Sequence, residues 1–231
     1  MSDNAKLTFG DKTCELPIIL GTEEEKAFDI SKLRGNTGLI TLDIGFKNTG
    51  STQSKITFLD GEKGILRYRG YSIEDLAEKS TFLEVAHLLI HGELPSAKVF
   101  KDFRKDITTH TLIHEDMKRF YEAYPSKAHP MGILASMVSA MSTFYPGSQD
   151  PNREAESINR TIIRLLAKIP TISAWAYKNS VGHPVVYPRN SLSYVENFVN
   201  MMFSLPTEDY EPDPLVVDAL DKLLILHADH E

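Results

Sequence analysis

The sequence predicts a mainly α-helical, multihelical domain preceded by small N-terminal β hairpins. Two observations indicate this fold class. From Tyr71 onward, apolar side chains recur every three or four positions, which is the period of a helix with one buried face. Before that point, β-prone runs alternate apolar and polar side chains and are bounded by turn residues. We therefore divide the chain into a β-rich segment, residues 1–53, and a helical part, residues 54–231.

Two hairpins are expected in the first third of the chain. Residues 7–16 alternate around a Gly10-Asp11 turn, and residues 56–68 form two β-prone runs separated by Asp60-Gly61. An isolated two-stranded hairpin is only marginally stable in water, so both are expected to attach to something larger. Between them, residues 20–53 are turn-rich and polar, which predicts an irregular connecting segment.

Helix starts are indicated by capping-box spacing, in which a Ser or Thr precedes an acidic residue by three positions. This spacing occurs at Ser72 with Asp75, Thr81 with Glu84, and Ser193 with Glu196. Asp213-Pro214 opens the last helix, because proline is harmless at the first helical position. These signals predict roughly eight or nine helices joined by short loops.

One predicted helix, over residues 131–144, carries a ridge of small side chains along one face. The ridge consists of Gly132, Ser136, Ser139, Ala140 and Thr143. Such a ridge lets a second helix approach closely. Two interpretations stay open: a tightly packed helix in the core of this chain, which is the commoner case, or a contact with a partner subunit.

The last predicted helix is expected to be buried on every side over residues 223–226, where four apolar residues follow one another. Its apolar stripe continues through Leu220 into His227 and His230, so both imidazoles are expected to face the core. No capping glycine follows this pattern, and we expect the chain to be cut within a longer polypeptide.

Composition excludes several classes of function. Lys and Arg total 25 against 32 Asp and Glu, a formal charge of -7, which argues against binding nucleic acid or an anionic membrane surface. The single cysteine, Cys14, excludes an internal disulfide and a thiolate zinc site. Neither a secretory signal nor an apolar run long enough to span a bilayer is visible, so we expect a cytoplasmic protein.

The densest polar cluster is HADHE, at residues 227–231. Imidazoles three positions apart project together from a helix and could bind a ligand, yet they are equally consistent with hydrogen-bonded core histidines. Neither this pair nor His110 with His114 has the third ligand of a zinc site, so no metal is expected. No nucleotide-binding, serine-nucleophile or thiol redox motif occurs, and no cofactor is expected.

Five stretches resemble the corresponding parts of citrate synthases. They are SKITFLDGEKGILRYRGYSIEDL (54–76), FLEVAHLLIHGELP (82–95), AHPMGILASMVSAMSTFY (128–145), VYPRNSLSYVENFVNMMF (186–203) and LLILHADHE (223–231). The extended N-terminal β segment is similar to that of the bacterial type that forms hexamers. The resemblance implies a citrate-synthase-like large domain, truncated before the small domain, and a homo-oligomer, dimer or hexamer, in the full-length form.

For function, the resemblance implies condensation of acetyl-CoA with oxaloacetate and water to give citrate and CoA. It assigns the oxaloacetate contact to His230, with His227 supporting it from one turn earlier. The family's catalytic Asp and His lie beyond this motif, so the resemblance implies no catalytic residue in this chain and no activity of the chain alone. Two alternatives stay open: a fragment of 2-methylcitrate synthase, which uses propionyl-CoA, and a non-catalytic helical binding module.

The resemblance also implies NADH as an allosteric effector, as in some bacterial members. The matching positions are His110, Thr111, Tyr145, Arg164 and Lys168. These residue types suit adenine stacking and phosphate pairing. The sequence departs from the family pattern at Thr109, where the family has arginine, and near Thr207, where it has a cysteine linked to regulation. The alternative interpretation is that Arg164 and Lys168 lie on a solvated helix face.

Overall fold

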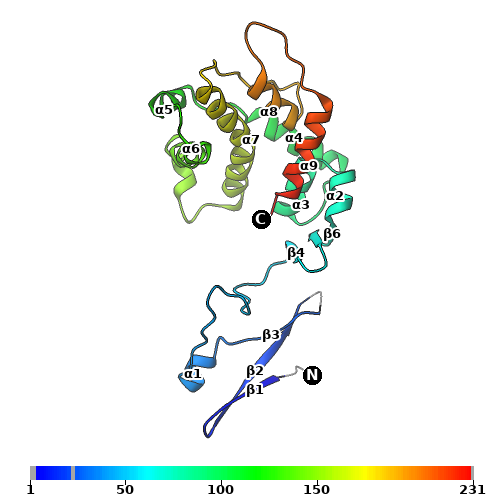
Figure 1. The fold of residues 1–231 in the computed structure, drawn as a ribbon, viewed down its shortest axis with the longest axis vertical. Coiled ribbons are helices and arrows are strands. Elements are labelled where there is room, and N and C mark those ends of the chain that lie inside the picture. The colour runs from blue at the N-terminus through cyan, green and yellow to red at the C-terminus, as the bar shows by residue number, and fades with distance from the viewer. Residues whose placement is uncertain (1–3, 22–23, 230–231) are drawn as a thin grey trace. The chain divides into compact units, whose positions relative to one another are not determined.

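The computed structural model describes residues 4–21 and 24–229 and divides the chain into two compact units, Met1–Ser54 and Lys55–Glu231 (Figure 1). The predicted fold class is confirmed, because the second unit is multihelical and the strands form two small sheets. None of the helices within the described residues is both long enough and apolar enough to cross a bilayer.

The first unit contains a three-stranded antiparallel sheet in the order β1-β2-β3. Its elements are β1 (Asn4–Phe9), β2 (Lys12–Leu20), β3 (Lys26–Phe28) and a short helix, α1 (Leu33–Thr37). The predicted hairpin is confirmed, with Leu7 opposite Cys14. Cys14, Leu16 and Leu33 form a small core. The expectation of an irregular segment from residue 20 onward is wrong for β3 and α1, which are too short to give a periodic pattern.

The second unit begins with another antiparallel sheet, β4 (Thr57–Asp60), β5 (Ile65–Tyr68) and β6 (Tyr71–Ser72). The second predicted hairpin is therefore confirmed, with Thr57 opposite Tyr68. This pairing brings the first residue of β4 beside the last residue of β5. Both residues contact the end of the last helix, as described below.

Helices make up most of the second unit. They are α2 (Ile73–Lys79), α3 (Phe82–His91), α4 (Ala97–Thr109), α5 (Lys118–Ala123), α6 (Pro130–Phe144), α7 (Ala155–Ser180), α8 (Tyr194–Phe203) and α9 (Pro214–Leu226), with short 3-10 turns η1 (Glu115–Met117) and η2 (Pro146–Gln149). The capping boxes at Thr81 and Ser193 are confirmed, and Ser72 accepts a hydrogen bond from the Asp75 amide. Asp213 caps α9, with Pro214 at its first position. These local signals therefore determine where the helices begin.

The long helix α7 lies at the centre of the packing and contacts α4, α5, α6 and α8. One core surrounds Trp175 and includes Tyr121 and Met137 from α5 and α6. A second core joins β5, α2, α3 and α9 through Tyr68, Leu76, Leu88 and Ile225. Burial of such large apolar side chains supplies most of the driving force for this arrangement.

Most of the small-residue ridge of α6 lies outside the core of this chain. The buried face of α6 carries Ile133, Met137 and Met141, whereas Gly132 and Thr143 on the ridge are exposed. The interpretation of the ridge as an internal packing surface is therefore wrong for Gly132, Ser139 and Thr143, whereas Ser136 and Ala140 are half-buried. The larger side chains bury more apolar area, so they determine which face of the helix turns inward.

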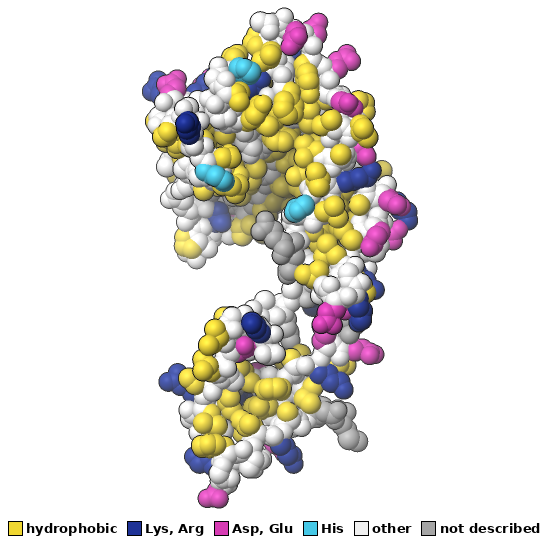
Figure 2. Space-filling view, in the orientation of Figure 1, with side chains coloured by type: hydrophobic (Ala, Val, Ile, Leu, Met, Phe, Trp, Pro, Cys, Tyr) yellow, Lys and Arg dark blue, Asp and Glu magenta, His cyan; other side chains and the backbone are white. Residues whose placement is uncertain are grey.

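Helix α9 is likewise not buried on every side. Ile225 is fully buried, but Leu223 is 50% exposed and Leu226 is 40% exposed, so the expectation of burial all round is wrong. The inner stripe instead runs through the half-buried Asp221, then Ile225 and Ala228. The Asp221 carboxylate accepts a hydrogen bond from the Phe82 amide at the start of α3, at 2.9 Å, and this contact explains an acidic residue on the inner face. Apolar side chains remain visible on the surface of this unit (Figure 2).

Candidate functional site

The first candidate region is the turn that ends α9 and precedes the second histidine of the HADHE motif. Helix α9 packs against α2, α3 and α8, and its fully buried Ile225 anchors the last turn in the core around Tyr68. A helix end leaves backbone carbonyls without intrahelical partners. The partners at this end come from the β4–β5 hairpin.

Tyr68 supplies the principal contact to this turn. Its side chain is fully buried, and its hydroxyl donates to the carbonyl oxygen of Asp229 at 2.8 Å and lies 3.3 Å from that of Leu226. The Asp229 amide donates back to the same hydroxyl oxygen at 3.4 Å. Burial raises the pKa of the Tyr68 phenol, so the hydroxyl stays protonated and able to donate. Thr57 adds a hydrogen bond from its hydroxyl to the Asp229 carboxylate.

His227 lies on the outer side of this turn. Its Nδ1 is 2.8 Å from the Leu223 carbonyl oxygen, and a carbonyl can only accept. The Nδ1 atom therefore carries the proton in this contact, and Nε2 is the nitrogen left for a ligand. The expectation that His227 faces the core is wrong, because the side chain is exposed. His230 lies outside the described residues, and its assignment to oxaloacetate stays a prediction.

The second candidate region surrounds Lys168 in the middle of α7. Lys168 is only 4% exposed, and its ammonium donates to the carbonyl oxygens of His110, at 2.7 Å, and Leu112. Burial lowers the pKa of Lys168 to about 8, and the neighbouring Arg164 charge acts in the same direction. The alternative interpretation of a solvated helix face is therefore wrong for Lys168.

All five positions predicted for NADH lie in this second region. The Arg164 guanidinium stacks over the Tyr145 ring at 4.3 Å from its centroid, and the Lys168 ammonium lies 5.9 Å from the same ring. Lys168 is bonded to His110, and the Thr111 carbonyl accepts a hydrogen bond from Thr171, also on α7, at 2.9 Å. Helix α7 therefore holds together two segments that are far apart in sequence, the one around His110 and the one around Tyr145.

A cavity of about 240 Å³ opens beside Tyr145 and Arg164. Arg153 also lines it and donates to the Ser148 carbonyl, while Ser142 and Thr161 contribute hydroxyl groups. Among the described residues that line this cavity none is acidic, so its charge is positive. Sequence reasoning missed Arg153, because the residue stands in a turn-rich segment that matches no motif.

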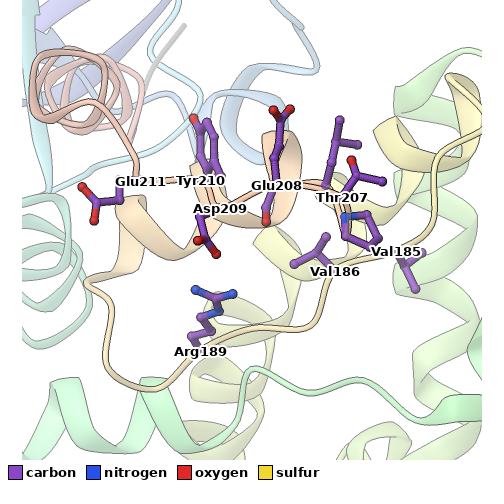
Figure 3. Close-up of a pocket in the computed structure, with 11 residues that line it drawn as sticks. Val185, Val186, Arg189, Thr207, Glu208, Asp209, Tyr210 and Glu211 are labelled. Atoms are coloured by element: carbon purple, nitrogen blue, oxygen red, sulfur yellow. The ribbon is translucent and has the colours of Figure 1, made fainter.

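A wider cavity of about 680 Å³ lies between residues 185–189 and residues 204–211 (Figure 3). Figure 3 shows the Arg189 guanidinium and the Asp209 carboxylate pointing toward one another across it. The fully buried Lys178 fixes one wall by donating to the Ser204 carbonyl at 2.6 Å. Thr207 lines this second cavity rather than the first.

No group of three or more His, Cys, Asp or Glu side chains converges on a metal-sized site within the part of the chain that the structure describes. His114 instead caps η1, where its Nδ1 accepts a hydrogen bond from the Asp116 amide at 3.1 Å. His110 places its Nδ1 2.7 Å from the Asp106 carbonyl oxygen. Both imidazoles therefore form hydrogen bonds with backbone groups through Nδ1.

Comparisons with known proteins identify one family. The family model described as citrate synthase, C-terminal domain, matches residues 45–231. Citrate synthase 1 of Mycobacterium tuberculosis is 50% identical over 229 residues, covering 99% of this chain and 53% of that protein. The citrate synthase of Corynebacterium glutamicum is 49% identical over 230 residues, covering 100% of this chain and 52% of that protein.

Solved structures give the same result. The citrate synthase of Pyrobaculum aerophilum superposes with a TM-score of 0.71 at 36% identity, over 81% of this chain and 47% of that one. That of Thermotoga maritima superposes with a TM-score of 0.68 at 29% identity, over 83% of this chain and 48% of that one. The fold is thus the multihelical fold of these enzymes. The chain belongs to the citrate synthase family and spans about half the length of the curated relatives it matches.

Proposed function

We propose that this chain forms the oxaloacetate-binding portion of a citrate synthase, an acyltransferase of the tricarboxylic acid cycle that condenses acetyl-CoA with oxaloacetate and water. The family match over residues 45–231, which includes the HADHE motif, carries this proposal. The lone buried Cys14 fits a reducing compartment, and we infer that the enzyme acts in the cytoplasm.

The chemistry explains why the motif needs imidazoles. Oxaloacetate is a dianion, and a closed site must aim fixed hydrogen-bond donors at its oxygens to hold it and to polarise its ketone. We assign this role to His230, with His227 supporting it through Nε2. Following the resemblance, we assign the acid and base for the acetyl-CoA methyl group to the part of a citrate synthase that follows the motif. The chain alone is therefore expected to show no turnover.

A chimaera tests this proposal. Residues 1–231 are joined to the remaining part of the Mycobacterium tuberculosis citrate synthase 1, which is 50% identical to this chain over the shared half. We expect release of CoA from acetyl-CoA in the presence of oxaloacetate. His230→Ala should weaken the use of oxaloacetate far more than it lowers the melting temperature. Equal losses of activity and melting temperature would indicate a core histidine instead.

The same chimaera separates the alternatives. A preference for propionyl-CoA over acetyl-CoA would indicate 2-methylcitrate synthase. An inactive chimaera that still folds would favour the non-catalytic helical module. The chain without its completing part serves as the control, and turnover at rates typical of citrate synthases by that control would contradict the assignment of the catalytic groups.

We further propose that NADH is an effector that binds beside Tyr145. The positive cavity lined by Arg153 and Arg164 suits a pyrophosphate, and the aromatic ring of Tyr145, which lines the same cavity, suits contact with an adenine. Thr109 in place of the family's arginine removes one cation from the set. Isothermal titration of NADH, with NAD⁺ as the comparison ligand, tests this proposal, and equal weak binding of both would contradict it.

We also propose that the full-length enzyme is a homo-oligomer, a dimer or a hexamer, with α6 at the contact between subunits. The exposed ridge of small side chains supports this, because it allows two helix backbones to approach closely. Replacing the exposed Ser139 by Trp should block the approach and shift the sedimentation of the chimaera toward the monomer. An unchanged sedimentation profile would place the contact elsewhere.

A further inference from the structure

The turn at the end of α9 is held by a hairpin that precedes it by some 160 residues of chain. Tyr68 and Asp229, which exchange hydrogen bonds, are separated by 161 positions, and Thr57 and Asp229 by 172. The ring of Tyr68 shares the hydrophobic core that holds α9 in place with Ile225, and these hydrogen bonds are additional to that packing. The hairpin thus makes polar contacts that act on the turn itself.

These contacts fix the conformation of the turn. The Tyr68 hydroxyl contacts two carbonyl oxygens, of Leu226 and Asp229, and one amide, that of Asp229. The ring cannot swing away, because it is fully buried among Ile73, Leu88 and Ile225. Thr57 fixes the Asp229 side chain from the paired strand. Backbone and side chain of Asp229 are therefore both set by β4 and β5.

We propose that Tyr68 and Thr57 are positioning residues for oxaloacetate binding: through Asp229, they orient the backbone that leads into His230 and the last helical turn that carries His227. This inference rests on the proposed function, since it assigns the two histidines to the substrate. Tyr68 and Thr57 act through Asp229, which both of them contact. They affect binding because a hydrogen-bonded site requires accurate geometry. A donor that is displaced loses much of its contribution to substrate binding.

The decisive variants remove a hydroxyl group and keep the shape of the side chain. Tyr68→Phe keeps the buried ring, and Thr57→Val keeps the branched side chain. In the chimaera we expect Tyr68→Phe to raise the KM for oxaloacetate by about fivefold to tenfold, the value of one or two hydrogen bonds. The KM for acetyl-CoA should change by less than about twofold, because the proposal assigns neither histidine to that substrate. Thr57→Val should have a smaller effect in the same direction, and Thr57→Ser should restore the original KM.

Tyr71→Phe is the matched control. Tyr71 belongs to the same sheet, opposite Tyr68, and is 44% exposed. Its loss of a hydroxyl should leave both KM values unchanged. Hydrogen–deuterium exchange supplies a readout independent of turnover: the Asp229 amide should exchange faster in Tyr68→Phe than in Tyr71→Phe.

The outcomes separate this inference from the proposed function. An inactive unmodified chimaera overturns the proposed function, and with it the assignment of a substrate to the turn. An active chimaera in which Tyr68→Phe leaves the KM for oxaloacetate unchanged overturns the inference alone. So does a Tyr68→Phe variant in which kcat, both KM values and the melting temperature fall or rise together, since that pattern indicates a structural role. A selective rise in the KM for oxaloacetate with faster exchange at Asp229 supports it.

Discussion

The end of α9 leaves its basic side chain exposed to solvent, whereas the middle of α7 buries one. His227, expected to face the core, is exposed, whereas Lys168, for which a solvated position was the alternative, is buried and bonded to two backbone carbonyls. The difference follows from position in the fold. Helix α7 is surrounded by four other helices, so even a lysine on it must find internal partners. Helix α9 has one covered face, and a histidine outside that face meets solvent.

The largest test of this comparison concerns the orientation of α9. Ile225→Ala should lower the free energy of unfolding by about 3 kcal/mol, because it removes a fully buried side chain and leaves a cavity. Leu223→Ala, two positions earlier and half exposed, should cost less than about 1 kcal/mol. Urea unfolding of both variants gives the comparison. Equal losses would mean that both faces of α9 are buried in solution.

The next test concerns the buried ammonium. Lys168→Met should lower the free energy of unfolding by about 2 kcal/mol, since the carbonyls of His110 and Leu112 lose a charged donor. Lys222→Met is the matched control on α9, where an exposed ion pair with Asp218 contributes less than about 0.5 kcal/mol. If the two substitutions cost the same, Lys168 does not hold the segment around His110 in solution.

The pH dependence of stability sharpens the same point. Burial lowers the pKa of Lys168 to about 8, whereas an unfolded lysine titrates at about 10.4. Between these values the unfolded chain binds more protons than the folded chain, so the free energy of unfolding rises with pH, by roughly 1 kcal/mol per pH unit. The difference between the wild-type chain and Lys168→Met, measured by urea unfolding from about pH 8 to about pH 10, should therefore grow. A difference that stays constant would show a lysine with an ordinary pKa.

Much of the fold could be predicted from local patterns, whereas the inward-facing sides of α6 and α9 could not. The capping boxes at Thr81 and Ser193 involve residues three positions apart, so the sequence alone places the start of each helix. The inner face of α9 includes Asp221, whose partner is the Phe82 amide on another helix. A pattern of apolar residues assigns such a carboxylate to the outside and rotates the helix accordingly.

The residues of the candidate sites likewise differ in whether a local sequence pattern identifies them. Residue types and spacing could nominate His110 and Arg164 only through resemblance to a family, because no periodic pattern connects a helix end with the middle of another helix. The contact between Tyr68 and Asp229 left no local signal, since it joins positions 161 apart. Arg153 was missed for a related reason: it lines the cavity beside Tyr145 from a turn, where a single arginine is usually solvated.

The smallest expected effect concerns the positive cavity. Arg164→Gln should weaken NADH binding by about fivefold to tenfold, because a guanidinium pairs with phosphate oxygens more strongly than a neutral amide does. Arg160→Gln, one turn earlier on α7, removes the same charge from an exposed pair with Glu156 and should change the affinity by less than about twofold. Isothermal titration of the chimaera with NADH measures both. Equal changes would indicate a general effect of net charge rather than a site at Tyr145, and the burial of Lys168 would then serve the stability of α7 alone.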